Sequence, residues 1–212
     1  MSTRTLFGLS ILCAAPALAV AAAAPAEVLH NDKVVVMEYK LSPGETVGVH
    51  GDHPAVNVYF GGNSVRFEPG AGAPTETAVK RGDTVYSPAQ AGQIKNTGNT
   101  ELHFVRVEFL TAGLPETWGR TGLAPNYKML IENQYTRTYD IRIPAHTNEP
   151  QHTHHARVVV CLSGAVLKHK MPDGSEEPST LKTGEVAWRR GATHIGQNLG
   201  DTDLWVIAVE PK

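Results

Sequence analysis

The sequence predicts an all-β protein in which two similar small barrels or sandwiches follow one another along the chain. Three observations lead to this prediction. An ungapped shift of 102 positions superposes His50 on His152 and runs from about Glu27–Phe109 to Met129–Pro211, which indicates a tandem duplication. Short runs of β-forming residues end at turns rich in Gly, Pro, Asn and Asp. No segment shows sustained helical periodicity.

The duplication divides the 212 residues into four expected parts. Residues 1–26 are expected to be an export signal, and residues 27–109 form the N-terminal domain. A connector covers residues 110–128, and the C-terminal domain covers residues 129–212. Each domain has close to 80 residues, which is near the lower end of what folds alone, so we expect the two to pack on each other.

The N-terminal segment has the composition of a secretory signal. Arg4 precedes the apolar run Leu6–Ala15, and both Ala17-Leu18-Ala19 and Ala24-Pro25-Ala26 fit the small-x-small pattern of a cleavage site. The rival interpretation is an uncleaved anchor, for which Pro16 and the alanine-rich tail make a poor spanning helix. The segment therefore predicts a periplasmic or secreted protein that has no membrane contact after cleavage.

Both halves are expected to contain strands at equivalent positions. Those of the first half cover Lys33–Leu41, Ala55–Phe60, Ser64–Glu68, Thr84–Ser87 and Glu101–Phe109. Their counterparts in the second half cover Tyr135–Ile143, Arg157–Leu162, Ala165–Lys170, Glu185–Trp188 and Asp203–Val209. Turns such as Gly61-Gly62-Asn63 and Pro172-Asp173-Gly174 separate the strands, as in antiparallel sheets.

Charge and cysteine content exclude several classes of protein. The chain has 19 Lys and Arg against 21 Asp and Glu, and no basic run, so nucleic acid is excluded as a partner. Of its two cysteines, Cys13 lies in the predicted signal, which leaves Cys161 without an intramolecular disulfide partner. Cys161 is expected to be a small buried core residue, and the alternative is a thiol that lines a pocket.

The histidines of the second half form a pattern typical of metal ligands. His152 and His154 make a His-x-His pair at the entrance of the strand predicted over Arg157–Leu162, and His194 follows in a later segment. Because side chains alternate along a strand, the pair projects from one side of the chain. A third histidine from a later strand then completes a facial set, which leaves coordination positions open for water, oxygen or a bidentate substrate.

These segments resemble the two sequence motifs of the cupin superfamily. The histidine pair with Gly164 corresponds to the first motif, and Gly191, His194 and Asn198 correspond to the end of the second. The resemblance spans essentially the whole chain after the signal and implies a bicupin with two tandem jelly-roll-like barrels. It also implies that His152 and His194 are ligands of one divalent transition metal, of the kind that imidazole suits, such as Fe, Mn, Ni or Zn.

The first motif departs from the family pattern. Arg157 stands where the family usually has a glutamate, so the site resembles cupins with three histidine ligands. The motif is also one residue short, which leaves His154 or His155 as the second ligand of the pair; strand alternation favours His154. The remaining histidines of this half, His146 and His169, match no motif position and are expected at the surface.

The missing glutamate has a chemical consequence. Three neutral imidazoles leave a divalent ion with its full charge, which favours an anionic substrate. By strand alternation, Arg157 points into the barrel together with Val159 and Cys161, where its guanidinium could hold a substrate carboxylate in bidentate fashion. We therefore take Arg157 as the candidate catalytic residue; the alternative is an ordinary surface arginine at the strand entrance.

The first half is expected to have a degenerate metal motif. His50 and His53 remain, but Asp52 stands opposite one histidine of the second half, and no histidine occupies the position of the third ligand. These three residues could bind a metal from one strand and loop alone, although one local cluster rarely supplies a full coordination shell. Asn57 and Tyr59 are expected to point inward, so this barrel is either a small polar pocket or a packed partner.

The resemblance and the three-histidine pattern together predict an exported metalloenzyme. The expected reaction is dioxygenation, isomerisation or a related conversion of a small anionic substrate that chelates the metal. The alternative is a non-enzymatic binding or sensing protein for a small ligand or a metal, because the cupin fold hosts both classes. Self-association into a homo-oligomer through a sheet edge is also expected for this fold.

Overall fold

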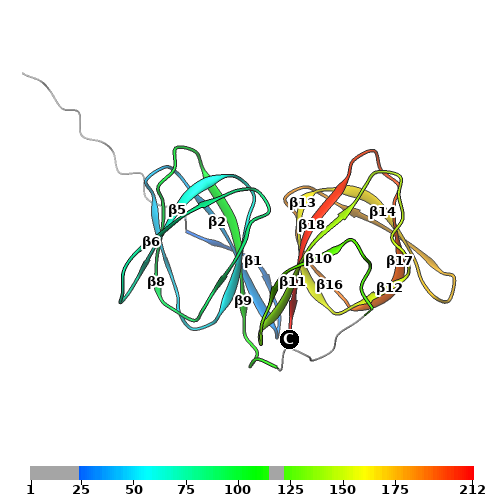
Figure 1. The fold of residues 1–212 in the computed structure, drawn as a ribbon, viewed down its shortest axis with the longest axis horizontal. Coiled ribbons are helices and arrows are strands. Elements are labelled where there is room, and N and C mark those ends of the chain that lie inside the picture. Colours follow the sequence, from blue (N-terminus) through cyan, green and yellow to red (C-terminus); the bar gives the residue numbers. More distant parts are fainter. Residues whose placement is uncertain (1–23, 115–121) are drawn as a thin grey trace, which may run out of the picture.

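In the computed structural model, the chain forms two barrel-like units side by side (Figure 1). The structure describes residues 24–114 and 122–212, and the regular elements of these residues are all strands. Residues 1–23, which carry most of the predicted export signal, lie outside this part. Ala26, the last residue of the predicted signal, is also the first residue of strand β1. Within the described residues, no helix has the length and apolar character needed to cross a membrane.

The first half contains a five-stranded and a four-stranded antiparallel sheet. The order of the larger sheet is β1-β2-β9-β4-β7, and that of the smaller sheet is β3-β8-β5-β6. The strands are β1 (Ala26–His30), β2 (Val34–Leu41), β3 (Thr46–Val49), β4 (Ala55–Tyr59), β5 (Asn63–Pro69), β6 (Thr75–Val79), β7 (Thr84–Ser87), β8 (Gly92–Asn96) and β9 (Leu102–Phe109).

The second half repeats this topology strand for strand. Its larger sheet has the order β10-β11-β18-β13-β16, and its smaller sheet has the order β12-β17-β14-β15. The strands are β10 (Tyr127–Glu132), β11 (Thr136–Ile143), β12 (His152–His154), β13 (Arg157–Ser163), β14 (Ala165–Lys170), β15 (Glu176–Leu181), β16 (Val186–Arg189), β17 (Ala192–Asn198) and β18 (Leu204–Pro211). The prediction of an all-β fold with two tandem barrels is confirmed.

The predicted strands are all present, but each half also contains four strands that the sequence did not predict. In the second half these are β10, β12, β15 and β17, and their counterparts in the first half are β1, β3, β6 and β8. Six of the eight lie at a sheet edge, where few residues are buried and the apolar pattern is weak. Strand β10 begins at Tyr127, inside the range predicted as the connector.

A single apolar core joins the two halves. Valines of β2, β4 and β9 pack with residues of β13 and β18, so the two larger sheets face each other. The core consists of Val34, Val36, Val56, Val58, Val105, Val107, Phe109, Val158, Val160, Leu162, Ile207 and Val209. Each of the two larger sheets therefore buries one face between the halves. Its other face lines a barrel interior, where it can carry polar side chains.

Candidate metal centre

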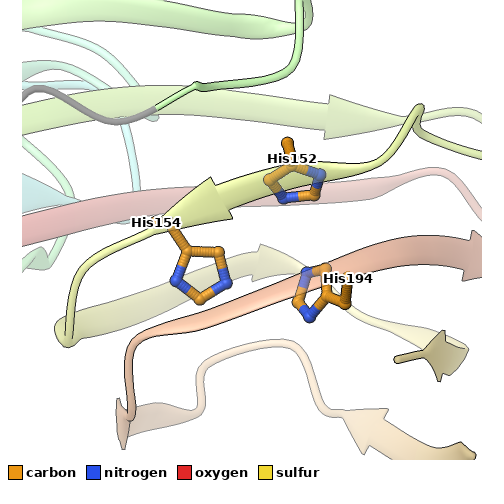
Figure 2. A group of neighbouring side chains, drawn as sticks. All are labelled: His152, His154 and His194. Atoms are coloured by element: carbon orange, nitrogen blue, oxygen red, sulfur yellow. The ribbon is translucent and has the colours of Figure 1, made fainter. Parts of the chain in front are cut away.

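The three predicted ligands of the second half come together between two paired strands. Strands β12 and β17 are antiparallel, and their register places His152 directly opposite His194. His154 lies two residues further along β12 and so projects from the same face. Figure 2 shows the three rings gathered in one space, with two carried by β12 and one by β17. The pairing of β12 with β17 thus brings residues that are about 40 positions apart in the sequence into one cluster.

The cluster has the dimensions and burial of a metal site. One ring nitrogen from each of His152, His154 and His194 lies within 4.8 Å of the others. The ring centroids are 4.8 to 5.7 Å apart, and each residue is at most 5% exposed. These three residues form the one group of potential metal ligands found among residues 24–114 and 122–212.

Backbone carbonyl oxygens orient two of the three imidazoles. The Nδ1 atom of His152 lies 3.0 Å from the carbonyl oxygen of Pro150, and that of His154 lies 3.0 Å from the carbonyl oxygen of His155. A carbonyl oxygen only accepts hydrogen bonds, so each Nδ1 carries the proton and each Nε2 keeps its lone pair. This arrangement is common for metal-binding histidines, because it fixes both the tautomer and the ring orientation.

The hydrogen bonding of the Nε2 atoms indicates whether a metal ion fits between the rings. The Nε2 atom of His154 is buried and has no hydrogen-bond partner among the described residues. The Nε2 atom of His152 accepts a hydrogen bond from the hydroxyl of Tyr127, 3.0 Å away. A buried polar atom without a partner is costly, and a cation between the rings would satisfy it. The residues present therefore fit a metal ion with imidazole ligands.

Burial keeps two of these imidazoles neutral. Burial lowers the pKa of His154 to about 2, and the positive charge of Arg157 acts in the same direction. Burial also lowers the pKa of His194 to about 3, assisted by the nearby His169 and His152. Since a metal binds the neutral form of histidine, the site is ready for an ion at neutral pH without first losing protons.

Arg157 is buried beside the histidines, so it is not a surface arginine. It begins β13, is 8% exposed and lines a cavity of about 320 Å³ together with His154 and His194. One of its terminal nitrogens donates to the hydroxyl of Tyr127 at 3.2 Å, while Nε and Nη1 are buried without partners among the described residues. Two nitrogens of this guanidinium are therefore available to donate hydrogen bonds to an anion.

Sequence reasoning missed a carboxylate at this site. Glu149 is 6% exposed and lines the same cavity, and its Oε2 atom lies 3.9 Å from Nε2 of His152. Its other oxygen accepts a hydrogen bond from the amide of Asn126 at 2.7 Å. Gly196 leaves room for it, because a Cβ atom there would overlap the carboxylate. Glu149 precedes β12 in an irregular segment, where no periodicity indicates its direction.

One histidine, His169, does not lie where the sequence indicated, and His155 is the alternative ligand that strand alternation disfavoured. His169, expected at the surface, is half-buried in the cavity, with its ring centroid 4.5 Å from that of His194, because its strand β14 pairs directly with β17. His155 lies outside the ligand cluster, and its backbone N–H donates to the Glu210 carboxylate at 3.2 Å. His146 is exposed, as expected.

For Cys161 and for the metal motif of the first half, the structure selects one of the alternatives that the sequence left open. Cys161 is fully buried in the apolar cluster inside the second barrel and does not line the cavity. His50, Asp52 and His53 form no potential metal group within the described residues. The first barrel nevertheless encloses a cavity that Asn57 and Tyr59 line.

No family model matches the chain, but one relative in sequence is clear. The oxalate-binding protein of Thermotoga maritima is 32% identical over 87 residues, which are 40% of this chain and 69% of that protein. The match thus covers more than two thirds of the relative.

Solved structures share the fold at low sequence identity. Oxalate decarboxylase from Lactobacillus farciminis is 12% identical with a TM-score of 0.62, over 84% of this chain and 77% of that chain. AerE from Microcystis aeruginosa is 11% identical with a TM-score of 0.60, over 89% and 97%. A cupin 2 conserved barrel domain protein from Leptotrichia buccalis is 12% identical with a TM-score of 0.56, over 89% and 88%. At these identities the likeness concerns the fold alone.

Proposed function

The chain belongs to the cupin superfamily, and we propose that its C-terminal barrel holds one divalent transition metal ion and binds a small dicarboxylate such as oxalate against it. His152, His154 and His194 would hold the ion, and Arg157 would bind the anion. The observation that carries the proposal is that one cavity holds both a free lone pair for a metal and free hydrogen-bond donors for an anion. The lone pair is that of Nε2 of His154, and the donors are Nε and Nη1 of Arg157.

The donor set limits the metal to a class. Three neutral imidazoles suit Fe, Mn, Ni or Zn, and availability decides among them. When bound, the ion supplies positive charge and polarises the oxygen atoms of the ligand. No carboxylate belongs to the three-histidine group, so that charge is not reduced by an anionic ligand of the protein within the group. Anion binding is therefore favoured on electrostatic grounds.

The cavity suits a small carboxylate. Its volume of about 320 Å³ is at the lower end of the range for ligand pockets. Three arginines and two glutamates line it, so the charged side chains of its wall leave an excess of one positive charge; they are Arg157, Arg189, Arg190, Glu149 and Glu177. The relative from Thermotoga maritima is named for oxalate binding, which supports a dicarboxylate with two adjacent carboxyl groups as the first ligand to test.

A second candidate function is catalytic. Splitting oxalate into formate and carbon dioxide breaks its carbon–carbon bond and requires one proton on the carbon that becomes formate. Glu149 is buried in the same cavity, 3.9 Å from His152, and is placed to supply that proton. Dioxygenation, predicted from the sequence, remains to be tested by oxygen uptake in the same assays.

The test separates binding from turnover. We expect calorimetry to show that oxalate binds the Mn(II)- or Fe(II)-loaded protein, that His194→Ala abolishes binding, and that the exposed control His146→Ala leaves it unchanged. Formate, carbon dioxide and oxygen are then measured on the loaded protein. Binding without turnover establishes the binding protein; turnover that Glu149→Gln removes establishes the enzyme. Equal oxalate affinity in His194→Ala contradicts both.

We propose further that the chain is exported and acts in the periplasm or outside the cell. The proposal rests on the sequence of the N-terminal segment, with Arg4 before the apolar run Leu6–Ala15. Cell fractionation with N-terminal sequencing tests it. A chain in the periplasm or medium that starts after Ala19 or Ala26 supports export. An unprocessed chain in the cytosol contradicts it.

A further inference from the structure

The N-terminal barrel contains a second cavity that the metal centre does not explain. It has a volume of about 400 Å³, within the range of small-molecule pockets, and is lined by residues of both sheets of this half. We propose that it is a metal-free binding site for a small monocarboxylate with an apolar body, which Arg106 holds by its carboxyl group. This proposal does not depend on the function proposed for the other barrel.

Arg106 is buried with an unused hydrogen-bond donor. It lies on β9, is 1% exposed and lines the cavity. Its Nε atom donates to Glu108 at 2.8 Å and Nη1 donates to the side-chain oxygen of Asn57 at 3.3 Å. Its Nη2 atom is buried and has no partner among the described residues. A guanidinium held rigidly by two partners, with its third nitrogen free, is a ready receptor for a carboxylate oxygen.

The duplication shows that the fold does not require this arginine. The position equivalent to Arg106 in the second half is Ala208, which makes the same strand pairings in the equivalent sheet. Conversely, the position of Arg157 is taken by Ala55 in the first half. Each barrel thus carries a buried arginine in its cavity, on a different strand. Burying a charge is costly, and the nitrogen of Arg106 that Glu108 and Asn57 leave without a partner points to a ligand.

The lining of the cavity defines the class of ligand. Arg106 is the only charged residue among those that line it, and Glu108, which pairs with its Nε atom, does not line the cavity. Val65, Phe67 and Ile94 provide apolar wall for the body of the ligand, and Tyr59 and Asn57 provide polar atoms. His50 and His53 do not line the cavity, and no potential metal group is found in the described part of this barrel. A single carboxyl group on an apolar body matches one cation within an uncharged wall.

The experiment uses 4-fluorobenzoate and its neutral analogue 4-fluorobenzamide with the full chain, followed by fluorine NMR. We expect saturable binding of the benzoate and weaker binding of the benzamide by about ten-fold or more, as for loss of a charged hydrogen bond. His194→Ala should leave the benzoate affinity unchanged, which separates this binding from the metal centre of the other barrel. Arg106→Met should weaken the affinity by about ten-fold or more.

Glu108→Gln provides an independent test if Arg106→Met fails to fold. The glutamine keeps an acceptor for Nε of Arg106 but removes the negative charge beside it, so benzoate should bind more tightly and benzamide should not. The proposal is overturned if acetate, butyrate and 4-fluorobenzoate all fail to bind at about 10 mM. It is also overturned if Arg106→Met binds benzoate as tightly as the unmodified protein, or if His194→Ala removes binding.

Discussion

Replacing Arg157 with methionine should stabilise the ligand-free protein and weaken its affinity for oxalate. Two buried nitrogens of this side chain, Nε and Nη1, lack partners, and each unsatisfied donor atom costs about 1–3 kcal/mol. The substitution also loses the hydrogen bond to Tyr127, which contributes about 1.5–3 kcal/mol because the donor is charged. At the middle of these ranges the net stabilisation is about 2 kcal/mol, which raises the Tm by about 4–8 °C for a chain of this size.

The comparison is made in the Glu210→Gln background. Burial raises the pKa of Glu210, and Arg157 offsets part of that effect, so removing the arginine alone would also change the cost of burying this carboxyl group. Differential scanning calorimetry gives the Tm, and titration calorimetry of the metal-loaded protein gives the oxalate affinity. We expect the affinity to fall by about ten- to a hundred-fold, equivalent to a lost charged hydrogen bond.

A matched control keeps the arginine and removes its partner. Tyr127→Phe deletes the hydroxyl to which Nη2 of Arg157 donates. The third nitrogen of the guanidinium then also lacks a partner, so the Tm should fall. The reasoning is refuted if Arg157→Met is less stable than its background while it still binds oxalate equally well. That result would make Arg157 a structural residue.

Three further predictions follow from the site. His154→Ala should abolish the stabilisation by Mn(II) or Fe(II), which is about 2.7 kcal/mol at a metal concentration of 100 Kd and is seen as a rise in Tm, whereas His155→Ala should keep it. Equal loss in both variants would contradict the assignment. Gly196→Ala should displace Glu149 and destabilise the protein by about 1.5–3 kcal/mol through loss of its charged hydrogen bond, measured by urea denaturation; an unchanged midpoint would contradict this packing. In metal-free protein, the free energy of unfolding should fall as the pH drops from about 6.5 towards 3, because the unfolded chain takes up protons on His154 and His194 that the folded chain excludes; a flat profile in this window would contradict the lowered pKa values.

Much of the fold could be predicted from the sequence, because the duplication and the buried strands leave strong patterns. Strand β13 lies inside its sheet and reads as a continuous apolar run after Arg157, and its counterpart β4 in the first half is buried along its whole length. Edge strands such as β15 could not be predicted, because four of its six residues are exposed and its sequence contains a proline. Such a strand forms because its neighbour β14 supplies hydrogen bonds along one side.

The candidate site was predictable where it depends on side-chain direction along one strand, and unpredictable where it depends on an irregular segment or on the pairing of distant strands. Strand alternation correctly placed His154 rather than His155 with His152, since a period of two is fixed by backbone geometry. Glu149 was missed because the irregular segment before β12 has no such period. His169 was missed because its position depends on the pairing of β14 with β17, a contact between segments far apart in the sequence.

The most direct test of the central claim is elemental analysis of the purified protein beside its His194→Ala variant. The arrangement of His152, His154 and His194 predicts about one transition-metal ion per chain in the unmodified protein and none in the variant. Absence of metal from both proteins, even after reconstitution with Fe(II), Mn(II), Ni(II) and Zn(II), would contradict a metal centre in the C-terminal barrel.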